Sequence, residues 1–123
     1  MTDEERYEQG MRVRREVLGD DHVDRAIENT DALTKDFQDY ITRNAWGEIW
    51  SRPGLSRRDR SLLTVALLAA LQHEGELAMH IKAAITNGVT KEEITEVLLQ
   101  VGLYAGVPTA NRAFATAKQT LNP

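Results

Sequence analysis

The stretch that decides the fold is SRRDRSLLTVALLAAL, residues 56–71. Ser56 followed three residues later by Asp59 is typical of a helix N-cap. From Leu62 onward the residues are apolar on nearly every side of a helix. A surface helix is apolar on one face only, so a helix of this kind belongs at the centre of a fold. We therefore predict a central helix over Arg57–Leu71.

The helical period of 3.6 residues continues on both sides of this segment, and no stretch alternates as a β-strand does. A thin inner face is expected on the first helix, at Tyr7, Met11, Arg14 and Leu18. The capping pairs Thr2 with Glu5 and Thr90 with Glu93, together with Gly and Pro, set the predicted boundaries. The other predicted helices cover residues 3–18, 23–28, 33–48, 74–87, a segment from Thr90 to before Gly106, and 109–121. This pattern predicts an all-α compact bundle of about six to seven helices.

Length and composition exclude several classes of protein. A chain of 123 residues predicts one domain over residues 1–123. The net charge of −4 argues against nucleic acid as a partner, and the longest apolar run is too short to span a membrane. The first residues do not resemble a secretory signal, so we expect a cytoplasmic protein. The absence of cysteine excludes disulfides and thiol nucleophiles.

A first candidate site is formed by His73, Glu76 and His80, which lie three, four and seven residues apart and so share one face of a helix. His80 can exchange a proton near neutral pH, and Glu76 can orient it from one turn away. Two imidazoles and a carboxylate are also ligands for zinc or iron. A structural alternative is that His80 is a half-buried histidine satisfied by a carbonyl or by Glu76.

A second candidate is Glu48, eleven residues after Phe37 and therefore on the apolar stripe of the helix predicted from Leu33. A carboxyl group at this position would be partly desolvated, which would raise its pKa and suit it to proton transfer. The alternative is that the helix ends before Trp50 and that Glu48 is a solvated terminal residue.

Two clusters of arginine stand out in an otherwise acidic chain. Because a guanidinium binds a carboxylate through two parallel hydrogen bonds, a basic loop can hold a small anionic substrate. The alternative, preferred for most of these residues, is a solvated helix surface or ion pairs between subunits. The clusters comprise Arg52, Arg57, Arg58 and Arg60, and Arg12, Arg14 and Arg15.

Three segments together resemble the carboxymuconolactone decarboxylase family. They are GMRVRREVLGD with the following HVD at residues 10–24, WGEIWSRPGL at residues 46–55, and the run from His80 to Pro108. The last segment alone would imply only the wider alkylhydroperoxidase-D-like superfamily. That resemblance implies an all-helical fold and a homo-oligomer, a trimer or hexamer. Redox members of the superfamily carry two cysteines where this chain has His73 and Glu76, so thiol chemistry is excluded.

The resemblance implies a decarboxylase (a carboxy-lyase) that needs no metal or organic cofactor. The family's reaction converts 4-carboxymuconolactone to 3-oxoadipate enol-lactone and CO2 in the catabolism of aromatic compounds. By residue type, His80 is expected to donate the proton and Glu48 to hold or relay it. The expected substrate-binding residues are Arg52 or Arg58, Trp46, Trp50, Tyr104 and Glu76. The alternatives are a decarboxylase or isomerase of a related lactone, and a non-catalytic helical binding protein.

Overall fold

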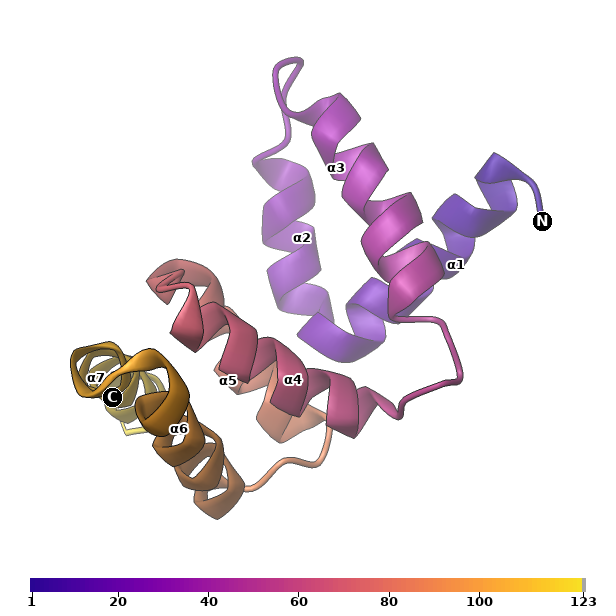
Figure 1. Cartoon of the computed structure of the whole chain (residues 1–123). Coiled ribbons are helices and arrows are strands. Elements are labelled where there is room, and N and C mark those ends of the chain that lie inside the picture. The colour runs from indigo at the N-terminus through magenta and orange to yellow at the C-terminus, as the bar shows by residue number, and fades with distance from the viewer. Residues whose placement is uncertain (123) are drawn as a thin grey trace. The chain divides into compact units, whose positions relative to one another are not determined.

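The structure is a computed structural model that describes residues 1–122 (Figure 1). It is built from helices, with no strand in that part of the chain, so the all-α prediction is confirmed. The helices are α1 Asp3–Leu18, α2 Asp20–Glu28, α3 Lys35–Ile41, the π-helix η1 Thr42–Ile49, α4 Arg57–Ala70, α5 Glu74–Thr86, α6 Lys91–Ala105 and α7 Val107–Leu121. Over residues 1–122, no helix is both long and apolar enough to cross a membrane.

Three helix starts follow the predicted caps. The Thr2 hydroxyl accepts the amide of Glu5 at 3.1 Å, and the Ser56 hydroxyl accepts the amide of Asp59 at 3.0 Å. At Thr90 both halves of the capping box form, because Glu93 also accepts the backbone N–H of Thr90. Each such cap satisfies amides that the helix itself leaves without a partner.

The chain divides into two compact units, Met1–Leu55 and a second that begins at Ser56. In the first unit, α1 packs on η1 through glycines. A Cβ atom added to Gly10 would lie 1.9 Å from the carbonyl oxygen of Thr42, and one added to Gly47 would lie 2.5 Å from that of Arg6. The two helices are therefore in backbone contact, which only residues without a side chain permit.

The helix predicted from Leu33 to Glu48 changes type at residue 42. From Thr42 to Ile49 it is a π-helix, whose i→i+5 hydrogen bonds give a wider turn and a different residue period. The face that is buried carries Thr42, Trp46 and Gly47, since this is the face towards α1. The predicted apolar stripe is exposed instead, at Leu33, Phe37 and Tyr40.

The second unit has its own apolar core. The central helix predicted over Arg57–Leu71 corresponds to α4, which packs against α5, α6 and α7. The core-facing residues of α5 and α6 are buried or, at Val97, partly buried, whereas Ile85 is exposed. The buried cluster comprises Val65, Ala69, Leu77, Ile81, Ala84, Val89, Ile94, Leu98, Val101, Ala113 and Ala117.

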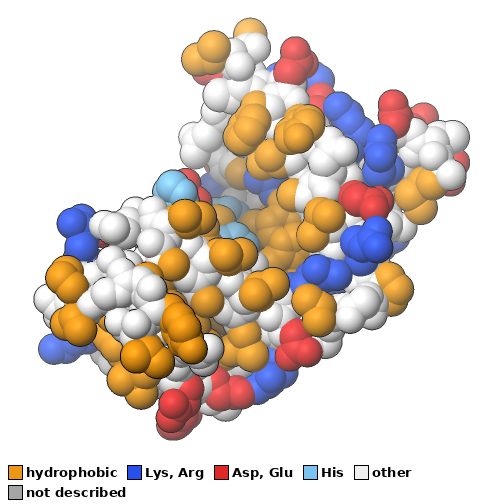
Figure 2. All heavy atoms as spheres, in the orientation of Figure 1, with side chains coloured by type: hydrophobic (Ala, Val, Ile, Leu, Met, Phe, Trp, Pro, Cys, Tyr) orange, Lys and Arg blue, Asp and Glu red, His pale blue; other side chains and the backbone are white. Residues whose placement is uncertain are grey.

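Large apolar side chains also remain at the surface of the second unit, and Figure 2 shows hydrophobic side chains gathered on the visible face of this unit. On α4, Leu63, Leu67 and Leu71 form an exposed row at intervals of four residues. Leu103 and Tyr104, at the end of α6, are exposed as well. Exposed apolar patches larger than scattered single residues are typical of interaction surfaces.

The glycine contact predicts opposite effects for the same substitution at two helical glycines. Gly10→Ala should lower the free energy of unfolding by more than about 2 kcal/mol, because the new methyl group must push η1 away. Gly75→Ala should raise it by about 0.5 to 1 kcal/mol, because nothing lies within 4 Å of the added Cβ and alanine favours the helix. Urea unfolding of both variants measures the difference, and equal effects would contradict the backbone contact.

Candidate functional site

His80 lies in the middle of α5 and is 8% exposed. Its neighbours Leu77 and Ile81 belong to the apolar core of the second unit. The two other members of the predicted cluster, His73 and Glu76, are exposed at the start of the same helix. The structure therefore separates one buried imidazole from two solvated side chains. A buried imidazole on a core helix is well placed to transfer a proton where water is scarce.

Glu48 is placed differently from our prediction. Its side chain is 49% exposed, and its Oε1 accepts a hydrogen bond from Nη1 of Arg52 at 3.1 Å. The predicted desolvation of Glu48 is wrong, because the π-helix turns this position away from the buried face. The structure does bring together two predicted site residues, since Glu48 and Arg52 form an ion pair one turn apart.

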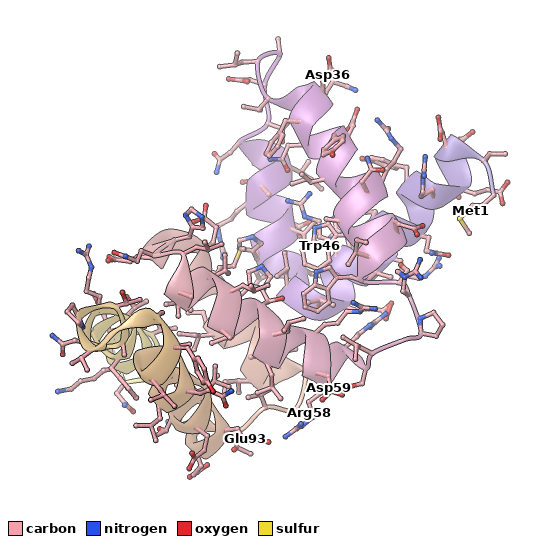
Figure 3. The ribbon with its side chains drawn as sticks, viewed as in Figure 1. Met1, Asp36, Trp46, Arg58, Asp59 and Glu93 are labelled. Carbon is pink, nitrogen blue, oxygen red and sulfur yellow. The ribbon has the colours of Figure 1, made fainter. Side chains whose placement is uncertain are left out.

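The two tryptophans predicted as dry walls lie in the first unit. Trp46 is buried on η1, and its ring stacks at a tilt on that of Trp50, with centroids 5.1 Å apart. Figure 3 labels Trp46 on this helix. The third predicted wall, Tyr104, is 81% exposed in the described chain. Of the three aromatic residues, Trp46 is buried and Trp50 is partly buried, whereas Tyr104 is exposed in the single chain.

Arg58 is held by acids of its own unit. Its guanidinium forms an ion pair with Glu93, whose other carboxylate oxygen closes the capping box at Thr90, and it also lies 3.8 Å from Asp59. Figure 3 shows Arg58, Asp59 and Glu93 near the starts of α4 and α6. This pairing within one unit differs from the preferred alternative for the arginine cluster, which was a solvated helix surface or ion pairs between subunits.

Arg14 is buried, with 6% of its surface exposed. Its cluster was interpreted mainly as a solvated surface or as ion pairs between subunits, although Arg14 itself was placed on the inner face of the first helix. It donates to Oε1 of Gln38 at 3.0 Å and to Oγ1 of Thr42 at 3.3 Å, both neutral oxygens. Burial lowers the pKa of the Arg14 guanidinium. The available signal was its position on the predicted inner face of the first helix, beside Met11.

His22 lies close to this buried charge. Burial, followed by the positive charges of Arg14 and Arg25, lowers the pKa of His22. The first unit therefore keeps a neutral imidazole beside a buried guanidinium. Two acids near the start of α2, Asp20 and Asp24, are engaged elsewhere, since both accept hydrogen bonds from Arg15.

No group of three His, Cys, Asp or Glu side chains within residues 1–122 is arranged to hold a metal ion. The alternative of a metal site at His73, Glu76 and His80 thus has no preformed arrangement in the described chain. Ser61, on the central helix α4, is buried, and its hydroxyl accepts a hydrogen bond from the side-chain amide of Asn87 at 3.1 Å.

Comparison with known proteins identifies the chain's relatives. Residues 35–119 match the Carboxymuconolactone decarboxylase family. The chain belongs to this family. It is 54% identical to the 4-carboxymuconolactone decarboxylase of Acinetobacter baylyi over 119 residues, which cover 97% of the chain and 89% of that protein. The resemblance inferred from the sequence is confirmed.

Two further relatives extend the comparison. The nitrosuccinic acid decarboxylase of Metarhizium robertsii is 40% identical over 116 residues, 94% of the chain and 81% of that protein. A 4-carboxymuconolactone decarboxylase of Pseudomonas putida is 50% identical over 48 residues, which cover 39% of the chain and the whole of that sequence. The family match begins at residue 35, whereas the matches to the first two decarboxylases must include α1 and α2 almost entirely.

The lowered pKa of His22 predicts a specific loss of stability in acid. The unfolded chain takes up a proton on His22 near pH 6.5, and the folded chain does so only at a lower pH. The contribution of His22 to the free energy of unfolding is therefore fully present above pH 6.5 and is lost as the pH falls towards the pKa of His22 in the folded chain. Between pH 7.5 and pH 5 the urea midpoint should fall further for the wild type than for His22→Gln.

The matched control for this measurement is His73→Gln, which removes an exposed histidine and should follow the wild type. A wild type and a His22→Gln variant with the same pH dependence would show that His22 is not held neutral by its surroundings.

Proposed function

We propose that this chain is a cofactor-free decarboxylase that converts 4-carboxymuconolactone to 3-oxoadipate enol-lactone and CO2. The observation that carries this proposal is the identity of 54% to a decarboxylase of that name over 97% of the chain. The family match and the agreement in length with that relative support the same reaction.

The chemistry of the substrate explains how such an enzyme can work without a cofactor. The departing carboxylate is attached to the γ-carbon of an unsaturated lactone. When its C–C bond breaks, the electron pair passes through the ring double bond to the lactone carbonyl oxygen. A proton then adds to the α-carbon, which gives the enol-lactone. The protein has to bind the second carboxylate, exclude water, stabilise the dienolate and supply that proton.

In this proposal His80 donates the proton, because it is a buried imidazole on a core helix. The role expected for Glu48, to hold or relay that proton, stays a prediction, since its carboxylate is half exposed and paired with Arg52. Glu76 is exposed one turn before His80 on α5, so its proposed role is to contact the substrate and not to orient the buried imidazole. Arg52 or Arg58 is the residue expected from the sequence to bind the acetate arm, and in the described chain each already forms an ion pair, Arg52 with Glu48 and Arg58 with Glu93.

Trp46 and Trp50 supply an apolar wall in the first unit, which supports their proposed role in excluding water. Tyr104 can take the same role only when its exposed ring is covered. We therefore also propose that the chain forms a homo-oligomer, a trimer or hexamer. The exposed leucine row of α4 and the exposed end of α6 support such an assembly. The cytoplasmic location expected from the sequence stays a prediction.

The relative from Metarhizium robertsii favours a broader substrate class for the same site. Nitrosuccinic acid, like the lactone, has two carboxyl groups and its own electron-withdrawing group, which can take up the electron pair released with CO2. The substrates in both relatives' names are therefore dicarboxylic acids that carry their own electron-withdrawing group. Assay of the purified chain on both acids would rank the two substrates.

The direct test is turnover by the purified protein with nothing added. We expect release of CO2 from 4-carboxymuconolactone and appearance of the enol-lactone, both measured over time. Exhaustive treatment with a chelator should leave the rate unchanged, because the proposed reaction uses the substrate's own carbonyl as electron acceptor. Loss of activity that zinc or iron restores would contradict the cofactor-free reaction, and a complete absence of turnover would contradict the substrate.

The role of His80 predicts a large effect on the rate from one substitution. His80→Ala should lower kcat for the lactone about 10²- to 10⁴-fold, the usual contribution of general acid catalysis. Circular dichroism should show unchanged helix content. His73→Ala is the matched control, since it removes a histidine seven residues earlier that is exposed. A His80→Ala variant with a near-normal kcat would remove His80 from the mechanism.

A further inference from the structure

The first unit contains a cation that the proposed reaction has not yet used. Arg14 is buried on α1, and no carboxylate within residues 1–122 contacts it. A guanidinium is always charged and strongly disfavours burial without an anion. A buried arginine that meets only neutral oxygens is therefore expected where an anion binds.

The donors of Arg14 are only partly used. A guanidinium has five N–H groups in one plane. Gln38 and Thr42 each accept one of them, and Nε is buried without a hydrogen-bond partner among the described residues. The N–H groups that remain can bind a carboxylate in the bidentate manner that arginine favours.

The two neutral partners orient the guanidinium and do not depend on it. The Thr42 hydroxyl donates its own proton to the carbonyl of Gln38 at 2.7 Å, so it keeps a partner if Arg14 is replaced. The Gln38 side chain is only partly buried and can turn to water. A purely structural role for the charge is therefore poorly supported, because its removal leaves no buried polar group without a partner.

The surroundings of Arg14 favour one negative charge. His22 is held in its neutral form beside Arg14, and the two nearby acids Asp20 and Asp24 are bound by Arg15. The buried ring of Trp46 follows Thr42 by four residues on η1 and adds apolar surface. An anion at Arg14 would meet positive charge, a neutral imidazole and little competing carboxylate.

We propose that Arg14 binds the carboxylate of the substrate that is retained in the product, the acetate arm. Arg14 thereby takes the role first expected of Arg52 or Arg58, which already form ion pairs with Glu48 and Glu93. This inference rests on the proposed function for the identity of the acid. A cation on the departing carboxylate would stabilise the ground state and slow the loss of CO2, whereas a cation on the retained carboxylate fixes the substrate without that penalty. Segments α1 and α2 lie outside the family match but inside the matches to the two decarboxylases, whose named substrates are both diacids.

The test compares Arg14→Met and Arg14→Lys with Arg12→Met, a matched control that removes one positive charge from the exposed surface of the same helix. Kinetics on the lactone should show KM raised about 10- to 100-fold for Arg14→Met, the usual effect of losing charge-assisted hydrogen bonds. Arg14→Lys should fall between it and the wild type. Arg12→Met should match the wild type.

A second measurement does not depend on turnover. Succinate, a simple diacid, should bind the wild type and raise its thermal midpoint, and this shift should be lost in Arg14→Met and kept in Arg12→Met. Without ligand, Arg14→Met should be at least as stable as the wild type, because a buried charge is removed. If Arg14→Met fails to fold, Arg14→Lys decides: weaker succinate binding supports the proposal, and unchanged binding overturns it.

The possible outcomes separate this inference from the proposed function. Lactone turnover with unchanged KM and unchanged succinate binding in the Arg14 variants overturns the role of Arg14 and leaves the decarboxylase intact. Succinate binding that depends on Arg14, in a protein that does not turn over the lactone, supports the carboxylate site and refutes the substrate. No saturable binding of succinate to the wild type overturns the site. A smaller particle mass by light scattering for Arg14→Met also overturns it, since a second copy would then cover the charge.

Discussion

The first unit depends on one contact, the meeting of the α1 and η1 backbones at Gly10 and Gly47. Two helices normally keep their axes apart by the thickness of their side chains. Here there is no room for even a methyl group, so the position of one helix fixes that of the other within narrow limits. Arg14 lies one turn beyond Gly10, and its partner Thr42 supplies the carbonyl that Gly10 meets. The geometry around the buried guanidinium thus follows directly from the glycine contact.

The helices of this protein could be predicted from the sequence because their signals are local. The caps at Thr2, Ser56 and Thr90 depend on residues three positions away, and the core face of α6 follows from its own period. Between residues 33 and 49 the same reasoning failed. The π-helix packs against α1 and is stabilised by that tertiary contact. The spacing of apolar residues in the sequence does not indicate a change from i→i+4 to i→i+5 hydrogen bonding.

The candidate site could be predicted only in part, for a related reason. The burial of His80 could be inferred because this residue shares the apolar face of its own helix with Leu77, whereas its role stays a prediction. Glu48 was misjudged because its burial depended on the helix phase. Arg14 was set aside because arginines in clusters are usually solvated, although its place on an inner face was visible in the sequence. Burial of a charge depends on what covers it, and that is a property of the tertiary structure.

The carboxylate of Glu93 has a consequence for the second unit. One of its oxygens closes the start of α6 and the other holds Arg58 at the start of α4. Fraying of either helix start would therefore weaken the other, so the starts of α4 and α6 are coupled through Glu93. An amide at this position could still accept the Thr90 N–H, but it would offer the arginine no charge. The coupling of the two helix starts thus requires a charged carboxylate, whereas a capping box alone can be formed by glutamine as well.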